Sequence, residues 1–316
     1  MHTAFLLAAG LGTRLRPLTL HRPKALLPVC GVPMLDYALA QARAHGHTSV
    51  LVNAHHLWTQ VAAWAVRNQV EVQVELPQIL GTGGGLYAAR ARLDPAGVVV
   101  LNADVLSNVD LTALRAAVPP EGAALALRPS PDAAKIRAVE ADEHGVIVHM
   151  ADIAPGSGGV PGTHFTGVHA LTGAAIARAP DPAEHGESCI IRTAYKAMMP
   201  ERLLRSIVHT GTWVDIGAPE HYLAANLDAL DGRLALSLDP WTRGAHGPGG
   251  SWVGPEAALR GQVHHSVIGA RAVVPEGATL RDCVVWDGVE VPPGEHEGAV
   301  FYGRAGAVAE KLAVRG

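Results

Sequence analysis

Residues 3–17 read Thr-Ala-Phe-Leu-Leu-Ala-Ala-Gly-Leu-Gly-Thr-Arg-Leu-Arg-Pro, an apolar run that leads directly into a glycine-rich loop. The run Thr3–Ala8 predicts a short β-strand, and Gly10 and Gly12 predict a turn after it. A loop of this kind exposes backbone N–H groups that can bind phosphate oxygens. The Rossmann pattern GxGxxG would need a glycine where the chain has Leu15, so that explanation fails.

Two cations follow the loop, Arg14 and, in the run Arg22-Pro23-Lys24, Lys24. Lys24 lies too far along the chain to complete a Walker motif, which needs Gly and Lys together. A triphosphate loop without a Walker motif favours chemistry at the α-phosphate. The alternative is a tight turn that carries two surface cations.

Strand and helix patterns alternate beyond this loop, which predicts an α/β fold with a mainly parallel sheet. Ligands of such folds lie at the carboxyl ends of the strands. The predicted strands are Thr3–Ala8, Ser49–Asn53, Val70–Leu76, Gly97–Leu101, Thr163–Leu171 and Leu203–His209, with a strand-rich stretch at Ala123–His149 and a loop at Asp152–Gly162. The predicted helices are Met34–His45, Leu57–Val66, Gly83–Leu93 and Pro219–Asp231.

A change of periodicity near residue 240 predicts a second domain. The stretch 239–250 reads DPWTRGAHGPGG, which has the composition of a linker. Beyond it, a period of six residues with aliphatic anchors appears, the signature of a hexapeptide β-helix. The positions that share this spacing are Val253, Leu259 and His265, and then Ile268, Val274, Leu280, Trp286 and Pro292. We expect a domain at 1–238, a linker at 239–250 and a short left-handed β-helix at 251–316, with an irregular β-rich tail as the alternative.

Composition narrows the classes of function. The chain has 316 residues with 48% apolar and 17% charged residues, which is enough apolar material for a buried core. The net charge of −4 argues against general electrostatic binding of nucleic acid. No apolar run approaches the ~18 residues needed to span a bilayer. Three dispersed cysteines, Cys30, Cys189 and Cys283, predict no disulfide framework or zinc site, so we expect a cytoplasmic protein.

Five segments in order resemble the motifs of the sugar-1-phosphate nucleotidyltransferases, also called nucleotide-sugar pyrophosphorylases. They are Gly10–Arg14 with Pro23-Lys24, Leu80–Leu86 (LGTGGGL), Leu101–Asp104 (LNAD), Phe165–Val168 (FTGV) and Gly211–Gly217 (GTWVDIG). Together they cover residues 3–232. The resemblance implies a Rossmann-like mixed sheet flanked by helices, of the nucleotide-diphospho-sugar transferase type.

The family's chemistry assigns roles to these positions by resemblance. A sugar-1-phosphate oxygen attacks the α-phosphorus of a nucleoside triphosphate, pyrophosphate leaves, and positioning and charge neutralisation supply the catalysis. Arg14 would hold the outgoing pyrophosphate and Lys24 would bridge the two phosphates, whereas Asp104 and Asp215 would bind Mg²⁺. The implied nucleotide-binding residues are Ala8, Ala9, Gly10, Gly12, Thr13, Gln78 and Gly83. The implied sugar-phosphate residues are Asn102, Thr166, Gly167 and Glu187.

The chain also departs from the family. Many members carry a Glu-Lys-Pro-type motif before the sugar-facing strand, but Met150–Pro161 reads MADIAPGSGGVP and has no lysine. In this respect the chain looks similar to the N-acetylmuramate-1-phosphate uridylyltransferases. The β-helical tail is instead similar to that of mannose- or glucose-1-phosphate enzymes, so base and sugar stay open.

Two rival functions follow from these departures. A non-catalytic regulatory or scaffold subunit that binds nucleotide-sugar would explain the missing lysine. An acyltransferase using His264 or His265 would need more coils to form a cleft. We expect the tail to serve as an assembly surface between subunits or as a cap on the catalytic domain. The numerous histidines, such as the pair His55-His56, lack the HExxH spacing of a metal helix.

Overall fold

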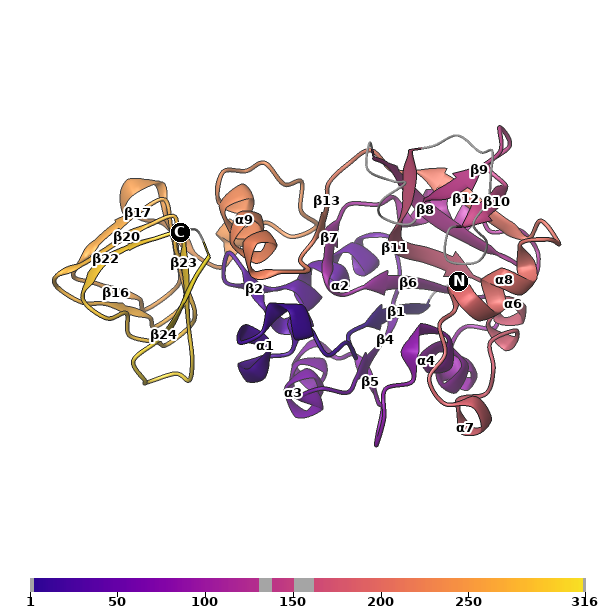
Figure 1. Ribbon diagram of the computed structural model, residues 1–316, viewed down its shortest axis with the longest axis horizontal. Helices are drawn as coiled ribbons and strands as arrows, with labels where there is room; N and C mark the ends of the chain where they lie inside the picture. Colours follow the sequence, from indigo (N-terminus) through magenta and orange to yellow (C-terminus); the bar gives the residue numbers. More distant parts are fainter. Residues whose placement is uncertain (1–2, 131–137, 151–161, 315–316) are drawn as a thin grey trace. The chain divides into compact units, whose positions relative to one another are not determined.

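The computed structural model describes residues 3–130, 138–150 and 162–314 (Figure 1). The chain divides into two compact units. The first contains Met1–Gly10 and Ala38–Trp213, and the second contains Leu11–Tyr37 and Val214–Gly316. The expected linker at 239–250 lies inside the second unit, and separate folding of the parts on either side of it stays a prediction.

A seven-stranded sheet forms the centre of the first unit, in the order β12-β8-β11-β6-β1-β4-β5. Its strands are β1 (Thr3–Leu7), β4 (Ser49–Ala54), β5 (Glu71–Val74), β6 (Val98–Asn102), β8 (Ala123–Pro129), β11 (Thr163–Leu171) and β12 (Leu204–Val208). Strands β6, β1, β4 and β5 pair in parallel, as do β8 and β12, whereas β11 is antiparallel to both of its neighbours. This mainly parallel mixed sheet confirms the predicted α/β class.

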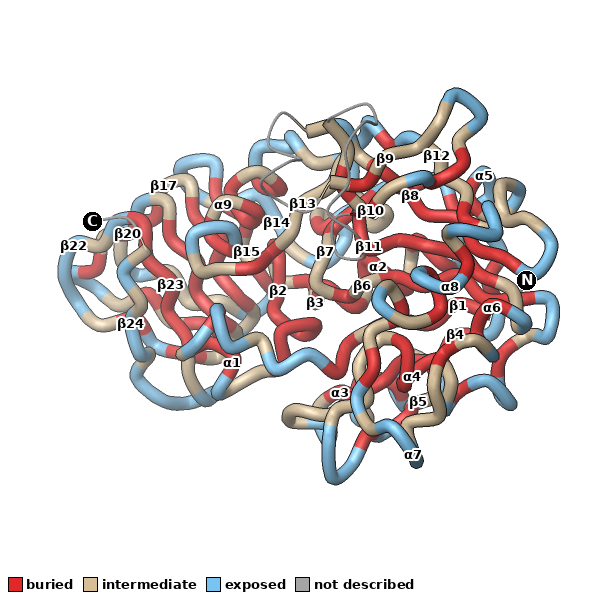
Figure 2. Tube along the Cα trace, turned by 45° about the vertical axis from the view of Figure 1, so that its right-hand side comes forward, coloured by how far each residue is buried: buried red, intermediate tan, exposed pale blue. Residues whose placement is uncertain are grey.

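Helices of the first unit lie close to the predicted Met34–His45, Leu57–Val66 and Gly83–Leu93, although the last of these begins at Gly81 and ends at Ala89, and the short helices after residue 110 were not predicted. The helices are α2 (Met34–Ala44), α3 (Trp58–Asn68), α4 (Gly81–Ala89), α5 (Leu111–Ala116), α6 (Gly173–Ala177), α7 (Pro182–His185) and α8 (Lys196–Met198). Phe5 of β1 and Val100 of β6 pack in one core with Leu86 of α4 and Ile176 of α6. Figure 2 shows β1 and β6 buried along most of their length. The shorter strands are β7 (Val105–Ser107), β9 (Val139–Ala141), β10 (Ile147–Met150) and β13 (Trp213–Asp215).

The edge strand β5 turns polar side chains inward. Gln73 and Glu75 are only 7% and 1% exposed, while Val74 and Leu76 are 36% and 59% exposed. An alternating strand normally buries its apolar positions, because burial of apolar surface drives folding. The inversion means that the buried side of β5 is used for hydrogen bonding, which positions the site described below.

The second unit combines an N-terminal segment with the C-terminal third of the chain. The N-terminal segment holds α1 (Leu18–His21) and the hairpin strands β2 (Pro28–Val29) and β3 (Val32–Pro33), and α9 (Pro219–Leu230) follows later. The tail strands are β14 (Ala245–His246), β15 (Trp252–Val253), β16 (Ala258–Leu259), β17 (Gln262–His264), β18 (Val267–Ile268), β19 (Val273–Val274), β20 (Ala278–Arg281), β21 (Val284–Val285), β22 (Gly294–Glu297), β23 (Ala299–Tyr302) and β24 (Glu310–Ala313).

The tail strands stack in parallel columns, as a β-helix requires. In one column Val253 pairs with Ile268, Ile268 with Val285 and Val285 with Phe301, so successive strands are offset by 15, 17 and 16 residues. Two further columns, β16-β19 and β17-β20-β22, run alongside. This stacking is consistent with the expected β-helix, and its left hand stays a prediction.

The six-residue register explains only part of the tail core, because buried core residues such as Val263, Val285 and Phe301 lie outside it, and the expected positions Val253, Leu259 and Pro292 are only partly buried. Four expected anchors, Ile268, Val274, Leu280 and Trp286, are buried. His265 is not an anchor, because its side chain is 37% exposed and paired with carboxylates. The stretch 239–250 also holds more structure than its composition predicted, since β14 within it pairs with β15.

The loop that carries the predicted cations is tied to α9 and to the tail. Tyr222 of α9 donates a hydrogen bond to the Pro28 carbonyl at 2.7 Å and accepts one from the Trp286 indole at 3.1 Å. The Arg22 guanidinium lies 4.6 Å from the centre of the Trp286 ring, within the range of a cation–π contact. The Trp252 ring covers Gly31 so closely that a Cβ there would overlap it. These contacts set the conformation of the loop between β1 and α2.

A histidine between two carboxylates joins α9 to the tail. One ring nitrogen of His265 lies 2.8 Å from a carboxylate oxygen of Asp231, and the other contacts Asp282. Arg233 also pairs with Asp231. Hydrogen bonds to the two carboxylates raise the pKa of His265 above its usual value, and the pKa of Asp231 is lowered by its bond to His265.

We expect His265→Asn to remove a pH-dependent part of the stability. A raised pKa in the folded state stabilises the protein fully below the unfolded value of about 6.5, and this contribution is lost as pH rises through the folded pKa. The melting temperature of the wild-type protein should therefore exceed that of the variant most at about pH 6, and the difference should shrink toward about pH 9. Asparagine tolerates the positive φ of 45° at this position. Parallel melting curves over this range would contradict the assignment.

Candidate functional site

The carboxyl ends of the parallel strands meet at a pocket of the first unit. Leu7 at the end of β1 pairs with Asn102 at the end of β6, so the segments that follow both strands leave the same edge of the sheet. A cavity of about 190 Å³ lies there. Its lining comes from Leu7, Ala9, Gly10, Asn53, Ile79, Gly81, Thr82, Asn102 and Asp104. The structure thus brings four predicted residues, Ala9, Gly10, Asn102 and Asp104, into one pocket.

The backbone that leaves β1 is held by the side chain of Asn53. The Asn53 Oδ1 atom accepts hydrogen bonds from the amides of Ala8 and Ala9 at 2.7 and 3.2 Å. Asn53 Nδ2 donates to Glu75 Oε1 at 2.8 Å, and Glu75 Oε2 accepts from the Leu80 amide at 2.8 Å. Neither Asn53 nor Glu75 was singled out in the sequence. The sequence signal that could have found Asn53 is its place as a polar residue at the end of the apolar run Val50–Val52.

The second glycine-rich segment forms the first turns of α4. The Gly83 amide donates to the Ser188 carbonyl at 2.8 Å, so this amide is used inside the protein. A Cβ on Gly85 would lie 2.9 Å from Glu75 Oε1, closer than real Cβ atoms approach. Glycine is therefore needed at position 85 because the buried Glu75 carboxylate lies against the helix.

The strand β11 reaches the pocket through a bulge. Its pairing with β8 shifts register between Phe165 and His169, and Gly167 has a φ of +83°. A Cβ on Gly167 would lie 2.5 Å from Asn102 Nδ2, so Gly167 leaves room for the side chain of a pocket residue. The Thr166 hydroxyl donates to the Ala126 carbonyl at 2.8 Å, so this hydroxyl is used within the sheet.

Three predicted charged residues gather in the second unit. The Lys24 ammonium lies 3.9 Å from Asp215 Oδ1, and its side chain is 10% exposed. The Arg14 guanidinium and Asp215 Oδ2 both flank Gly217, at 3.1 and 3.2 Å from where a Cβ would be. The Thr19 hydroxyl bonds the Gly12 carbonyl at 2.8 Å and fixes the start of the loop, while Thr13 is exposed. The cluster is well placed to bind anionic phosphate, since Arg and Lys are both phosphate ligands.

The remaining predicted residues lie at the surface. Gln78 and Glu187 are both exposed, and neither lines the 190 Å³ cavity. The Glu187 side chain lies beside Gly81, with its Cγ 3.0 Å from where a Cβ of Gly81 would be. The lysine-free stretch Met150–Pro161 lies, apart from Met150, outside the described residues.

Carboxylates suited to a hard cation are present, one in each unit. Asp104 lines the pocket of the first unit, and Asp215 belongs to the charged cluster of the second. In the portion of the chain that the structure describes, no three His, Cys, Asp or Glu side chains converge as metal ligands. Each aspartate taken by itself has the chemistry of a Mg²⁺ ligand, since Mg²⁺ commonly takes one or two carboxylates and completes its shell with water and phosphate oxygens.

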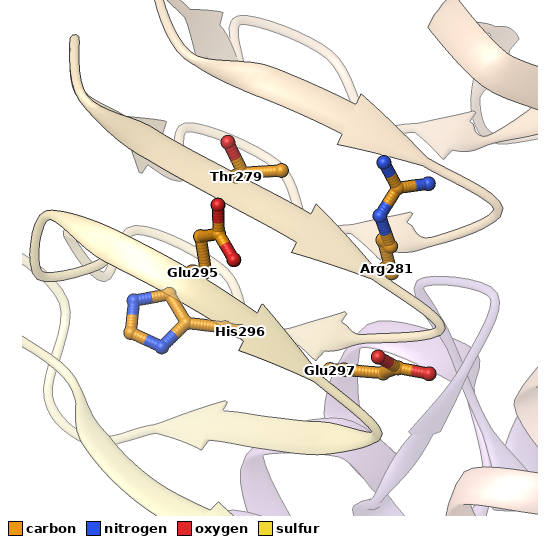
Figure 3. A pocket seen from close by; sticks show the side chains of 5 residues that line it. All are labelled: Thr279, Arg281, Glu295, His296 and Glu297. Atoms are coloured by element: carbon orange, nitrogen blue, oxygen red, sulfur yellow. The ribbon is translucent and has the colours of Figure 1, made fainter.

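A second hollow, of about 320 Å³, lies on the tail. Figure 3 shows its lining: Thr279 and Arg281 come from β20, and Glu295, His296 and Glu297 from β22. Both ring nitrogens of His296 already have partners, the Pro292 carbonyl at 2.9 Å and the Lys311 ammonium at 3.2 Å. The hollow contains none of the residues predicted for the site. Over the described ranges, no helix has both the length and the apolar character to cross a membrane.

Comparison with known proteins matches the part of the chain that carries the motifs and the strand-end pocket. Residues 3–232 match the model of a family described as nucleotidyl transferase. A mannose-1-phosphate guanylyltransferase of Mycobacterium tuberculosis is 30% identical over 311 residues, which cover 92% of this chain and 81% of that protein. An N-acetylmuramate alpha-1-phosphate uridylyltransferase of Caulobacter vibrioides is 29% identical over 70% of this chain and 94% of its own length.

A solved structure shows the fold independently. The crystal structure of HddC from Yersinia pseudotuberculosis superposes with a TM-score of 0.58 over 72% of this chain and 98% of that chain. The two sequences are 19% identical, so this similarity concerns the fold alone. The expected transferase-type sheet is confirmed.

Proposed function

Because this chain belongs to the nucleotidyl transferase family, we propose that it transfers a nucleotidyl group from a nucleoside triphosphate to a sugar-1-phosphate. An oxygen of the sugar-1-phosphate attacks the α-phosphorus and forms the new P–O bond. The bond from the α-phosphorus to the oxygen bridging to the β-phosphate breaks, and pyrophosphate leaves with that oxygen. The observation that carries the proposal is the pocket at the carboxyl ends of β1 and β6, which the loop Ala9-Gly10 lines together with Asn102 and Asp104.

Each charged residue of the motifs has a role in this reaction. Arg14 would hold the departing pyrophosphate, since its planar guanidinium suits bidentate phosphate contact. Lys24, a buried point charge beside Asp215, would lie between the α-phosphate and the incoming sugar phosphate and reduce their repulsion. Asp104 and Asp215 would hold Mg²⁺, which supplies charge neutralisation at the reacting phosphates when bound.

The neutral residues of the site complete the binding of both substrates. The loop of Ala8, Ala9, Gly10, Gly12 and Thr13 would bind the triphosphate, with Gln78 and Gly83 near the base. The amides of Ala8 and Ala9 donate to Asn53, so these two residues would fix the shape of the loop. Asn102 would bond the sugar or ribose through its amide, and Gly167 keeps the space that this side chain occupies. Thr166 and Glu187 would border the sugar.

We propose GTP with mannose-1-phosphate as the preferred substrate pair. The relative named for that reaction matches 92% of this chain, the tail included, whereas the uridylyltransferase relative matches 70%. The test is a pyrophosphate-release screen of GTP, UTP, ATP, CTP and dTTP against mannose-, glucose- and N-acetylmuramate-1-phosphate. Greatest turnover with GTP and mannose-1-phosphate is expected. Greatest turnover with UTP would overturn the choice of base, and no pyrophosphate release with any pair would overturn the reaction itself.

A further inference from the structure

Two buried polar side chains join the two loops that border the pocket. The side chains of Asn53 and Glu75 are 2% and 1% exposed. Asn53 lies in β4, and Glu75 directly follows β5, the parallel neighbour of β4. One end of the pair binds the loop after β1, and the other binds Leu80 directly before α4. A buried polar group is costly unless it is hydrogen-bonded, so the pair is stable only when both loops keep these positions.

The direction of every hydrogen bond in the pair is fixed. The amides of Ala8, Ala9 and Leu80 can only donate. The Asn53 atom that faces the first two must therefore be its oxygen, which turns the Asn53 NH₂ group toward Glu75. The Glu75 carboxylate then accepts at both of its oxygens, from Asn53 and from Leu80. With a carboxylate at position 75 and an amide at position 53, every donor in this network faces an acceptor.

We propose that Asn53 and Glu75 are a positioning pair, which holds the phosphate-binding loop and the start of α4 in the one arrangement that binds the nucleoside triphosphate. The proposal rests on the proposed function and adds to it two residues outside the family motifs quoted above. Both loops line the same cavity, through Ala9 and Gly10 on one side and Gly81 and Thr82 on the other. The pair acts through these loops rather than on the reacting atoms.

Exchanging the amide of Asn53 and the carboxylate of Glu75 tests whether the hydrogen bonds of the pair matter or only the volume of its side chains. In Glu75→Gln, an amide must meet two donors with a single oxygen, so one donor faces another. In Asn53→Asp, two carboxylates face each other. In the double variant N53D/E75Q, the new carboxylate accepts from Ala8, Ala9 and the new amide, whose oxygen accepts from Leu80. The double variant thus restores every bond with the same shapes and the same net charge.

The experiment measures the KM of each substrate and the melting temperature for the wild-type chain and these three variants. Each single variant is expected to raise the KM for the triphosphate by roughly 10- to 100-fold, the effect of leaving one buried polar group unsatisfied. The double variant is expected to return it to within about threefold of wild type, because the two sites couple directly. The KM for the sugar-1-phosphate should change less in all three.

A matched control is available in the same unit. Gln41 is a buried amide, 4% exposed, whose Nε2 donates to the Val109 carbonyl at 2.9 Å. Gln41→Glu introduces a carboxylate facing that carbonyl and should lower the melting temperature without changing the KM for the triphosphate.

Two results from the variants would overturn the proposal. One is a triphosphate KM within about twofold of wild type in both single variants, a change too small for a lost buried bond. The other is a double variant no better than the poorer single variant. Calorimetric titration with GTP and UTP separates this inference from the reaction. Binding without turnover in the wild-type protein would contradict the reaction only, and the same titrations on the variants would then decide the role of the pair. Absence of binding would contradict both.

Discussion

Asp104→Asn and Asp215→Asn are each expected to lower pyrophosphate release by at least roughly 100-fold, the order seen when one preorganised electrostatic contact at a reacting centre is lost. Asparagine keeps the shape of aspartate but removes its charge, and a neutral amide is a weaker ligand for a hard cation. Asp104 lies in the strand-end pocket and Asp215 beside Lys24, so both replacements act where the phosphates are proposed to bind. The measurement is the initial rate of pyrophosphate release over a range of Mg²⁺ concentrations.

A surface aspartate provides the control for this pair. Asp110 caps α5 by accepting hydrogen bonds from the amides of Thr112 and Ala113 at 2.9 and 3.0 Å. Asparagine is an equally good N-cap, so Asp110→Asn should change neither the rate nor the melting temperature appreciably. Full activity in Asp104→Asn and in Asp215→Asn would remove both from the proposed metal site. Circular dichroism reports whether each variant is folded. Loss of activity in a variant that is also unfolded would show that the aspartate has a structural role.

Trp252→Ala is expected to destabilise the second unit by about 3–5 kcal/mol, the usual cost of truncating a buried tryptophan. Trp252 is 1% exposed, its indole donates to the Pro240 carbonyl at 3.1 Å, and its ring covers Gly31 in the hairpin of the N-terminal loop. The variant should melt roughly 10–20 °C below wild type, the shift that follows from an entropy of unfolding of about 2.1 cal/mol/K per residue over a unit of about 130 residues. Thermal unfolding followed by circular dichroism measures the shift.

The control for this replacement is Trp58→Ala. Trp58 begins α3 in the first unit and is 37% exposed, so its truncation should have a much smaller effect. Trp252 also packs on Gly31, in the loop that carries Arg14 and Lys24. The Trp252→Ala variant should therefore lose activity even at temperatures at which it is still folded. An unchanged rate of pyrophosphate release at 25 °C would show that the tail does not influence that loop.

Local patterns were sufficient to predict most of the central sheet. The strand Thr3–Ala8 and the helix Met34–His45 were each predicted within about two residues, because their signals are contained in short windows. Pro219 and Gly232 likewise predicted both ends of α9, where Gly232 has a φ of +70°. The alternation of Val72 and Val74 predicted a strand, but it could not reveal that the polar positions of β5 face inward.

The motifs predicted only some of the residues that line the strand-end pocket. Gly10, Asn102 and Asp104 come together because they lie at or just beyond the carboxyl ends of the paired parallel strands β1 and β6, where such a sheet presents its ligands. Asn53 and Glu75 could not be found in this way, since their importance depends on which backbone amides they meet in the folded chain. His265 was placed in the six-residue register by spacing, although its ion pairs depend on contacts formed between distant segments.

The shared packing of the N-terminal loop and the tail has a consequence for the order in which the chain can fold. The Cys30 amide donates to Asn226 across 196 residues of sequence, and Arg22 lies against Trp286. Such non-local contacts form late, because a long loop must close before they contribute. During synthesis the strands of the central sheet can pair early, while the loop of Arg14 and Lys24 must wait until α9 and the segment around Trp286 have been made. We therefore expect a nascent chain to bury its sheet before this loop takes its folded conformation.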